Sequence, residues 1–461
     1  MNKTAETLQL LRDYESRNVL FTEPDGSWPI VWEKAKGVHV WDADGKKYLD
    51  LTAAFGVAAA GHANPRVVEA GQKQMATLLH AMGDVHPHSR KAELARELSR
   101  VTFERWTAPA GSEIRGSGLE LWSRESPPPN SKPETQNAKP QAGKTIFCNS
   151  GFEAVEAALK TAILATGRHG VIAFQNGYHG LGYGTLNATQ REHFRGPFKM
   201  QLKEFGHFVQ FPSKPADLAV VELLIRRLFQ RGWIGAILVE PIQARGGINI
   251  PPPEFLPMLR RLCDEHKALL ILDEIYTGFG RTGKWFACEH SGVIPDVICL
   301  GKALTGGFPL SACVGRAEIM DAAWPASHGE AIHTSTYLGH PVGCAMALAQ
   351  IAEIESGELP ERSAKLGEVL LQWLEALISN PKLQIRSRGR GLMAGVELRL
   401  PNGEPATEAA IHAIKAMLQR GFILLPEGEH SNVISFTPPL TISKTQLGEA
   451  VAALADILKH E

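Results

Sequence analysis

The chain has 461 residues, 44% of them hydrophobic and 21% charged, and its 48 Lys and Arg nearly balance its 49 Asp and Glu. This length allows two domains around a large core. The near-neutral charge excludes a general attraction to nucleic acid or to an anionic membrane. No apolar stretch approaches the roughly 20 residues of a membrane span, and the acidic residues near the N-terminus are not typical of a signal peptide.

The six cysteines are scattered along the chain without a Cys-x-x-Cys pair, and several lie inside apolar runs. This pattern is typical of reduced, buried thiols in a cytoplasmic protein. We expect no metal site.

The N-terminal segment, residues 1–20, has the spacing of an amphipathic helix. We expect Leu8, Leu10, Leu11 and Tyr14 to lie on one side of it.

Residues 37–51 alternate between apolar and polar positions and turn at Asp44-Gly45, which predicts a β-hairpin. Helical patterning follows through Leu98. Residues 107–144 then break the pattern, because they are rich in Pro, Ser, Gly, Asn and Gln. We interpret them as a mobile surface insertion in preference to a functional lid.

Residues 148–160 are typical of a strand end, a tight turn and a strong helix. Ser150, Gly151 and Phe152 stand where the free amides and the dipole of a helix start can bind an anion. Taken alone, Ser-Gly before a helix is more often a simple cap than a phosphate site.

Two further apolar runs end in polar residues. Residues 171–174 are followed by Tyr178 and His179, and residues 237–239 are followed by Glu240. The sequence thus predicts polar side chains at the exits of two more buried strands.

Residues 268–304 hold two apolar runs with a polar group at the end of each. Residues 268–272 stop at Asp273, and residues 297–300 stop at Gly301-Lys302. Open α/β sheets bind ligands at the carboxyl ends of their parallel strands. A lysine there can form a Schiff base with an aldehyde if desolvation lowers its pKa, and Asp273 can balance the charge of a pyridinium nitrogen. The alternatives are an ordinary strand exit and a solvated surface lysine.

The run that ends in Asp273-Glu274 also imitates the magnesium-binding strand of a P-loop ATPase. That class needs Gly-x-x-x-x-Gly-Lys-Ser/Thr before a helix. The best match, ending at Gly143-Lys144-Thr145, begins with Ala138, and residues 146–148 have a strand pattern. We therefore exclude the nucleotide-binding alternative.

Leu270 to Gly283, followed by Gly301 to Leu304, resembles the signature of the class III aminotransferases. The resemblance extends over most of the chain. It implies fold type I, an α/β architecture with a mixed, mostly parallel sheet in a large domain and a small α+β domain built from both termini. The implied division is 1–60 for the N-terminal part of the small domain, 61–335 for the large domain and 336–461 for the C-terminal part. We expect residues 389–398 to form a strand of this C-terminal part.

The resemblance also implies pyridoxal 5′-phosphate as cofactor, with Lys302, Asp273 and Tyr178 as catalytic residues. Tyr178 would stack on the pyridine ring and Ile275 would lie on its other face. Thr336 would reach the phosphate across a homodimer interface. The implied cofactor-binding residues are Ser150, Gly151, Phe152, Tyr178, His179, Glu240, Asp273, Ile275, Tyr276, Lys302 and Thr336.

The substrate side departs from the family pattern. Leu181 stands where carboxylate-binding members have arginine, and Arg245 and Ser435 stand where many members have a glutamate–arginine pair. We interpret Arg245 as a free guanidinium suited to a carboxylate, with Phe55 and Trp28 lining the same site. The alternative is a surface arginine.

The favoured function is transfer of an amino group from an amine or amino acid to a 2-oxo acid. The alternative is an amino-acid racemase, epimerase or aminomutase of the same family, which uses the same site but returns the proton elsewhere. A non-enzymatic role would predict loss of Lys302 or Asp273, and both are present.

Overall fold

The apolar runs between residues 143 and 316 pair side by side in one seven-stranded sheet. The computed structural model describes residues 3–23, 26–109, 114–115, 121–122, 140–376 and 382–460. All neighbouring strands in this sheet are parallel except where β12 runs antiparallel to both its neighbours. The predicted α/β class with a mixed, mostly parallel sheet is confirmed. In spatial order the strands are β6 (Gly143–Cys148), β12 (Ser311–Arg316), β11 (Val297–Leu300), β10 (Leu269–Asp273), β9 (Ile234–Val239), β7 (Gly170–Phe174) and β8 (Gly206–Val209).

Helices bury both faces of this sheet, which explains why its strands are apolar at nearly every position. Successive side chains of a strand point to opposite faces. Leu238 and Ile271 pack against α6 (Gly151–Thr166). Their neighbours Ile237 and Leu270 pack in the cluster that contains α9 (Leu218–Phe229) and α10 (Phe255–His266).

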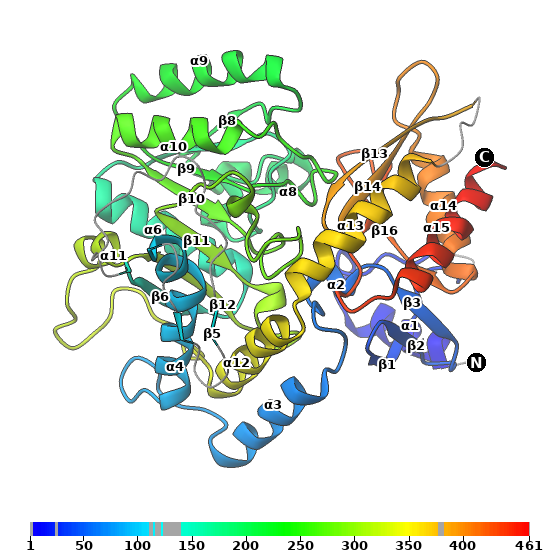
Figure 1. Cartoon of the computed structure of the whole chain (residues 1–461), viewed down its shortest axis with the longest axis horizontal. Helices are drawn as coiled ribbons and strands as arrows, with labels where there is room; N and C mark the ends of the chain where they lie inside the picture. The colour runs from blue at the N-terminus through cyan, green and yellow to red at the C-terminus, as the bar shows by residue number, and fades with distance from the viewer. Residues whose placement is uncertain are drawn as a thin grey trace.

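Two smaller sheets stand apart from the large one, and both termini lie beside them (Figure 1). One has the order β1 (Trp32–Lys36), β2 (His39–Asp42), β3 (Lys47–Asp50) and β15 (Phe422–Ile423). The other has the order β13 (Gln384–Arg390), β14 (Met393–Arg399), β17 (Val433–Phe436) and β16 (Leu425–Glu427). The parallel pairing of β15 with β3 joins the two ends of the chain in one sheet. The predicted hairpin at Asp44-Gly45 forms between β2 and β3.

The remaining helices complete the layers around these sheets. The first group is α1 (Lys3–Tyr14), α2 (Ala53–Gly56), α3 (Pro65–Thr77), α4 (Ser89–Ser99), α5 (Arg105–Thr107), α7 (Tyr183–Leu186), α8 (Glu192–Arg195) and α11 (Ala317–Ala323). The C-terminal group is α12 (Pro341–Ser356), α13 (Leu359–Glu375), α14 (Thr407–Gln419) and α15 (Lys444–Leu458).

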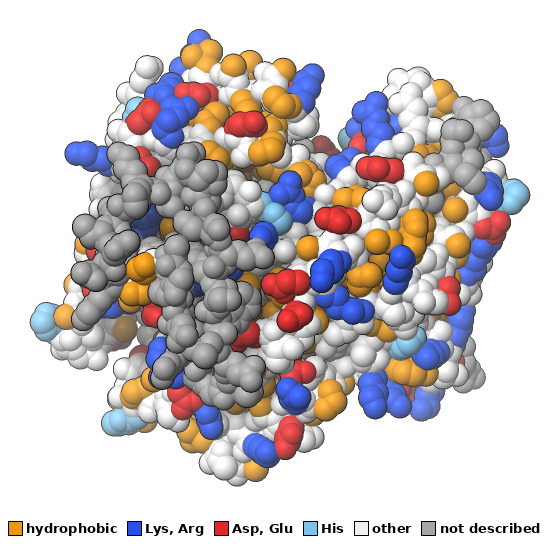
Figure 2. Space-filling model, in the orientation of Figure 1, with side chains coloured by type: hydrophobic (Ala, Val, Ile, Leu, Met, Phe, Trp, Pro, Cys, Tyr) orange, Lys and Arg blue, Asp and Glu red, His pale blue; other side chains and the backbone are white. Residues whose placement is uncertain are grey.

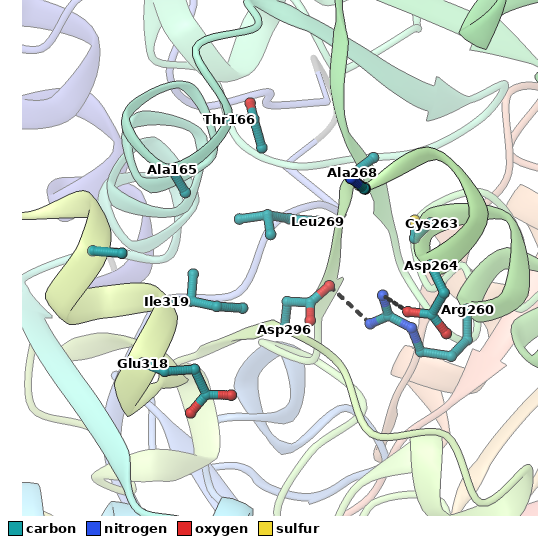
Figure 3. Close-up of a pocket in the computed structure, with 12 residues that line it drawn as sticks. Ala165, Thr166, Arg260, Cys263, Asp264, Ala268, Leu269, Asp296, Glu318 and Ile319 are labelled. Atoms are coloured by element: carbon teal, nitrogen blue, oxygen red, sulfur yellow. Dashed lines mark hydrogen bonds and ion pairs between the residues drawn. The ribbon is translucent and has the colours of Figure 1, made fainter.

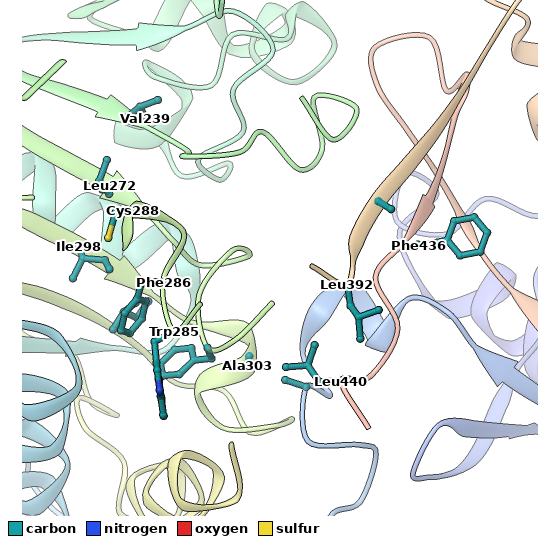
Figure 4. Close-up of a cluster of buried hydrophobic side chains, with 14 of the residues drawn as sticks. Val239, Leu272, Trp285, Phe286, Cys288, Ile298, Ala303, Leu392, Phe436 and Leu440 are labelled. Atoms are coloured by element: carbon teal, nitrogen blue, oxygen red, sulfur yellow. The ribbon is translucent and has the colours of Figure 1, made fainter. Parts of the chain in front are cut away.

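One continuous hydrophobic cluster joins the large sheet to the small ones. Val239, Leu272 and Ile298 face it from strands β9, β10 and β11, and Phe436 and Leu440 face it from the C-terminal part of the chain (Figure 4). The groups at the carboxyl edge of the large sheet are therefore held against the smaller sheets by shared core packing.

All six cysteines are buried free thiols: Cys148, Cys263, Cys288, Cys299, Cys313 and Cys344. Within the described ranges, no helix is long and apolar enough to cross a membrane. Basic and acidic side chains are interspersed over the face shown in Figure 2.

Two sequence predictions about individual elements are wrong. Helix α1 forms, but only Leu8 is buried, whereas Leu10 is 53% exposed and Tyr14 is 86% exposed. At about 100° per residue, Leu10 and Tyr14 project away from Leu8, so the four residues do not share one face. In addition, residues 389–398 are not a single strand, because Gly391 takes a left-handed φ of 56° and turns β13 back into β14.

The proposed insertion at 107–144 falls mostly outside the described residues. Its described parts are residues 107–109, the paired strands β4 (Ile114–Arg115) and β5 (Leu121–Trp122), and residues 140–144, where β6 already begins. The predicted mobile loop lies outside the described residues, so it stays a prediction.

Candidate functional site

Asp273 and Lys302 lie at the carboxyl ends of adjacent parallel strands. Asp273 is the last residue of β10 and pairs with Cys299 of β11, and Lys302 follows β11 by two residues. Lys302 has a φ of 43°, which is strained for a residue with a side chain. The structure therefore brings the predicted acid and lysine to one edge of the sheet.

Asp273 forms a buried pair with His179. Its Oδ2 lies 2.8 Å from His179 Nδ1, and its Oδ1 accepts a hydrogen bond of 3.2 Å from the amide of Ile275. Thr189 Oγ1 accepts the His179 amide at 2.9 Å. Burial opposes the charged imidazole, but the hydrogen bond and charge of Asp273 outweigh burial and raise the pKa of His179. The carboxylate thus has a fixed orientation in the core of the site.

The Lys302 amine lies over an aromatic ring, with Nζ 4.8 Å from the ring centre of Tyr276. Burial lowers the pKa of Lys302, although Asp273 and Glu240 oppose this shift. A lower pKa increases the fraction of neutral amine, which is the nucleophilic form.

Ile275 packs between two glycines of the site. A Cβ at Gly151 would lie 3.0 Å from Ile275 Cδ1, and a Cβ at Gly301 would lie 3.3 Å from Ile275 Cγ2. The absence of these two side chains allows Ile275 to fit between the start of α6 and the turn before Lys302.

The start of α6 leaves backbone donors available. Ser150 is the N-cap, but its side chain makes no capping hydrogen bond. Its hydroxyl donates to Glu153 at 3.2 Å, and the first helical amide bonded to the Ser150 carbonyl is that of Glu153. The amides of Gly151 and Phe152 therefore have the position and polarity of an anion site.

Glu240 connects two loops of the site. Its Oε1 accepts the amide of Tyr178 at 2.8 Å, and its Oε2 accepts the amide of Ala244 at 2.9 Å. Burial raises the pKa of Glu240 to about 7. The two hydrogen bonds place the loop of Tyr178 beside the loop that carries Arg245.

Arg245 lies between two aromatic rings. Its guanidinium carbon is 5.0 Å from the ring centre of Tyr178 and 6.0 Å from that of Phe55. Phe55 is 46% exposed and belongs to the turn of residues 53–56, in which every φ is positive. Thr52 caps this turn by accepting the Ala54 amide. Arg245 thus joins the predicted substrate residue Phe55 to the predicted cofactor residue Tyr178.

Two charged residues of this region were missed by the sequence analysis. Glu427, at the end of β16, is buried, and its charge is felt by Arg245, Arg191 and Lys302. Arg191, just before α8, lies 5.2 Å from the ring of Phe194. No local motif identifies either residue, since β16 and α8 reach the site only through the tertiary fold.

The expected site residues Trp28 and Thr336, and the departures at Leu181 and Ser435, have the following surroundings. Trp28 packs with the cluster of Val40 and Tyr48 beside the N-terminal hairpin. Thr336 is exposed, and Leu181 is 47% exposed. The Ser435 hydroxyl donates to the carbonyl of Leu425 at 3.1 Å.

A pocket of about 400 Å³ occurs at the opposite edge of the large sheet (Figure 3). It is lined by Leu269, which begins β10, and by Asp296, which directly precedes β11. Two of its acidic groups bind Arg260, which pairs with Asp264 at 2.7 Å and with Asp296 at 2.8 Å. This pocket therefore lies at the opposite ends of the strands that lead to Asp273 and Lys302.

Residues 21–114 and 125–458 match the family model of the class III aminotransferases. The chain is 34% identical to an acetylornithine aminotransferase of Methanosarcina mazei, over 96% of this chain and 94% of that protein. It is 35% identical to a 5-aminovalerate aminotransferase of Pseudomonas aeruginosa, over 93% of each chain.

A solved structure shares the fold. It is that of an amine transaminase from an uncultivated Pseudomonas species in its PLP-bound form, with a TM-score of 0.81, 28% identity, and coverage of 97% of this chain and 98% of that one. The predicted family, fold and cofactor are thereby confirmed. The chain belongs to the class III aminotransferases and is a pyridoxal-phosphate-dependent aminotransferase of fold type I.

Proposed function

We propose that Lys302, Asp273 and Tyr178 form the catalytic centre, and that this enzyme acts on an amino donor with an apolar or neutral body. A carboxylate on the donor, or on the 2-oxo acid that accepts the amino group, would bind Arg245 close to the reacting carbon. The observation that carries the proposal is the position of Lys302 and of the buried Asp273–His179 pair at the ends of adjacent parallel strands.

The residues of the site fit pyridoxal phosphate. The amides at the start of α6 suit its phosphate, and the buried carboxylate of Asp273 suits a protonated ring nitrogen. Ile275 offers an apolar contact to the ring and is held in place between Gly151 and Gly301. Tyr178 would contact the other side of the ring, with Ser150, Phe152, His179, Glu240 and Tyr276 surrounding it.

When bound, pyridoxal phosphate supplies an aldehyde that condenses with amines and a ring that withdraws electrons from the carbon bearing the amino group. Lys302 Nζ would hold the cofactor through its aldehyde until the donor amine takes its place. The Lys302 amine would then act as the base that removes a proton from the donor carbon and as the acid that returns one. His179 would keep Asp273 oriented, and Asp273 would favour a protonated ring nitrogen.

Arg245 is the group that supports a carboxylate-bearing substrate. It lies in a loop fixed by Glu240, and the described residues provide no hydrogen-bond acceptor for its buried Nε. A guanidinium held between aromatic rings can present its donors to a carboxylate in a bidentate pair.

We also propose a homodimer in which Thr336 reaches the phosphate bound to the other subunit. The exposure of Thr336 supports this arrangement, because its side chain is available to a second subunit. The six unpaired cysteines support a cytoplasmic location. The division into residues 1–60, 61–335 and 336–461 is proposed with these features.

The substrate proposal is tested with Arg245→Ala. This variant should raise KM for carboxylate-bearing donors and acceptors by about a hundredfold and leave amines without a carboxylate nearly unaffected, because a charge-assisted pair contributes roughly 2–3 kcal/mol. Arg231→Ala, at an exposed arginine, serves as the control.

Equal KM values in wild type and Arg245→Ala for both kinds of substrate would place carboxylate binding elsewhere. Because Leu181 offers no charge to a distal carboxylate, 4-aminobutyrate and ornithine should be poor donors, and efficient turnover of either would contradict this part of the proposal. Following optical rotation together with oxo-acid formation separates transamination from racemisation.

A further inference from the structure

Three charged side chains around Tyr178 and Lys302 make no hydrogen bond with any described residue. They are Glu427, Arg245 and Arg191. Both arginines have a buried Nε without an acceptor, and Glu427 is only 5% exposed. Leaving a buried charged group unpaired costs more than the about 1–3 kcal/mol of a neutral one. Such a cluster indicates groups that become paired when a ligand binds.

The backbone fixes Glu427 close to the loop of Arg245. The amide of Gly428 donates to the carbonyl of Arg245 at 3.1 Å. The other end of this loop is held by Arg388 of β13, whose Nη2 donates to the carbonyl of Gly247 at 2.6 Å. The distance between the carboxylate and the guanidinium is therefore set by the fold of the small sheet and not by a direct ion pair.

Charges from several elements face Glu427. Arg245 precedes the turn at Gly247, Arg191 lies before α8, Lys302 follows β11, and Glu240 follows β9. On its own side of the site, the exposed Glu429 acts on Arg191. The phenol of Tyr276 also feels the charge of Glu427. An ionised Glu427 therefore balances the charge of one of the two guanidiniums that face it.

A substrate without a carboxylate and a substrate with one make opposite demands on this cluster. A substrate without a carboxylate needs an anion already in place to balance the two guanidiniums. A substrate with a carboxylate brings its own negative charge, which repels an ionised Glu427 strongly because the site is buried. Burial raises the pKa of Glu427 to about 7, against the opposing influence of Arg245 and Arg191, so protonation is accessible near neutral pH.

We propose that Glu427 is a specificity-determining residue that serves as the counter-ion of Arg245 and Arg191 when the bound amine has no carboxylate, and that takes up one proton from solvent when a substrate carboxylate binds there. The proton returns to solvent when the carboxylate leaves. This inference rests on the proposed role of Arg245, and it explains how one site can hold both an amine and a 2-oxo acid in the two halves of a transfer.

Proton uptake is measured by calorimetry on the cofactor-loaded enzyme. The probe is 4-methylvalerate, a carboxylic acid with an apolar body and no amino or oxo group, titrated in two buffers that differ in ionisation enthalpy. Near pH 8 its binding should take up close to one proton, and near pH 5 close to none, because Glu427 is then already protonated. The amide 4-methylvaleramide, which brings no charge, should take up none at either pH.

Variants assign the proton to Glu427. Glu427→Gln should abolish the uptake near pH 8, whereas Glu429→Gln, which removes the same charge two residues further along at an exposed position, should retain it. In turnover, wild-type KM for a 2-oxo acid should rise about tenfold per pH unit above the pKa of Glu427, and this slope should be absent in Glu427→Gln.

Absence of uptake by the wild-type enzyme near pH 8 would overturn the inference without any variant, as would equal uptake by Glu427→Gln. Either result would leave amino transfer itself intact. Failure of the proposed function would instead appear as no amino transfer by the wild-type enzyme with any donor and acceptor.

Discussion

Each side chain of the proposed catalytic centre owes its chemistry to its immediate surroundings. Lys302 has a lowered pKa because it is buried, and Asp273 is oriented because His179 and the amide of Ile275 bind its two oxygens. These two residues therefore yield the clearest predictions at the scale of single residues.

Lys302→Ala should abolish amino transfer, because the other site residues offer no primary amine at the end of β11. Borohydride reduction of the wild-type enzyme should attach the cofactor covalently to Lys302, as peptide mapping would show. Recovery of the label on another lysine would show that the assignment is wrong.

Asp273→Asn should keep the cofactor bound but slow amino transfer by several orders of magnitude. The amide cannot hold a proton on the ring nitrogen, and it also disturbs the pairing with His179. The measurements are cofactor content by absorbance and kcat by oxo-acid release. A nearly normal kcat in this variant would mean that the ring nitrogen reacts without a proton.

The sequence predicts the residues that directly follow buried strands but not those that reach the site from elsewhere. Asp273, Glu240 and Lys302 could be placed because an apolar run ends at or just before each of them. Glu427 and Arg191 could not, because their positions depend on how β16 and α8 pack against the large sheet. The departure at Arg245 was visible in the sequence, but Glu427, whose charge interacts with Arg245, is on a strand that the motif does not include.

At the scale of elements, tight crossings hold the small sheets against their helices. Helix α13 crosses the turn between β13 and β14 at Gly367, where an added Cβ would lie 2.2 Å from the carbonyl oxygen of Gly391. Backbone atoms on both sides prevent relaxation of this contact. The crossing therefore depends on glycine at position 367.

Gly367→Ala should lower the free energy of unfolding by about 1–3 kcal/mol or more through overpacking. Gly448→Ala is the matched control, because Gly448 is also helical and a Cβ there would meet Trp373 at an ordinary 3.4 Å. This control should be neutral or stabilising, since alanine favours helix. Denaturant midpoints of the two variants provide the comparison, and equal midpoints would refute the argument.

Helices and strands could be predicted where apolar residues followed one regular spacing over a long segment. The buried strands around Asp273 and the helix after Ser150 are of this kind. The strand pair around Gly391 was not resolved from the sequence, because apolar residues continue through the turn and only the backbone conformation of Gly391 reverses the chain. Helix α1 was found, but its buried face was wrong because a few leucines do not define a stripe.

At the scale of the whole molecule, the proposed homodimer predicts a shared phosphate site. Thr336→Val should weaken cofactor binding by about tenfold, the effect of one hydrogen bond of roughly 1–1.5 kcal/mol. Thr334→Val is the control, since the Thr334 hydroxyl bonds to Asp84 at 2.5 Å within the same chain. The cofactor dissociation constant tests the role of Thr336, and the molecular mass in solution tests the homodimer. A monomer that binds the cofactor as tightly as the wild-type assembly would rule out the shared site.

The burial of all six thiols makes the chain suitable for chemical labelling. Burial raises the pKa of Cys148, Cys263, Cys288, Cys299 and Cys344, so few of these sulfurs are thiolates in the native state. A maleimide dye should therefore attach to a single cysteine introduced at an exposed position without removal of the native ones. On heating, the rate at which the native thiols become reactive would then report the rate at which the core opens.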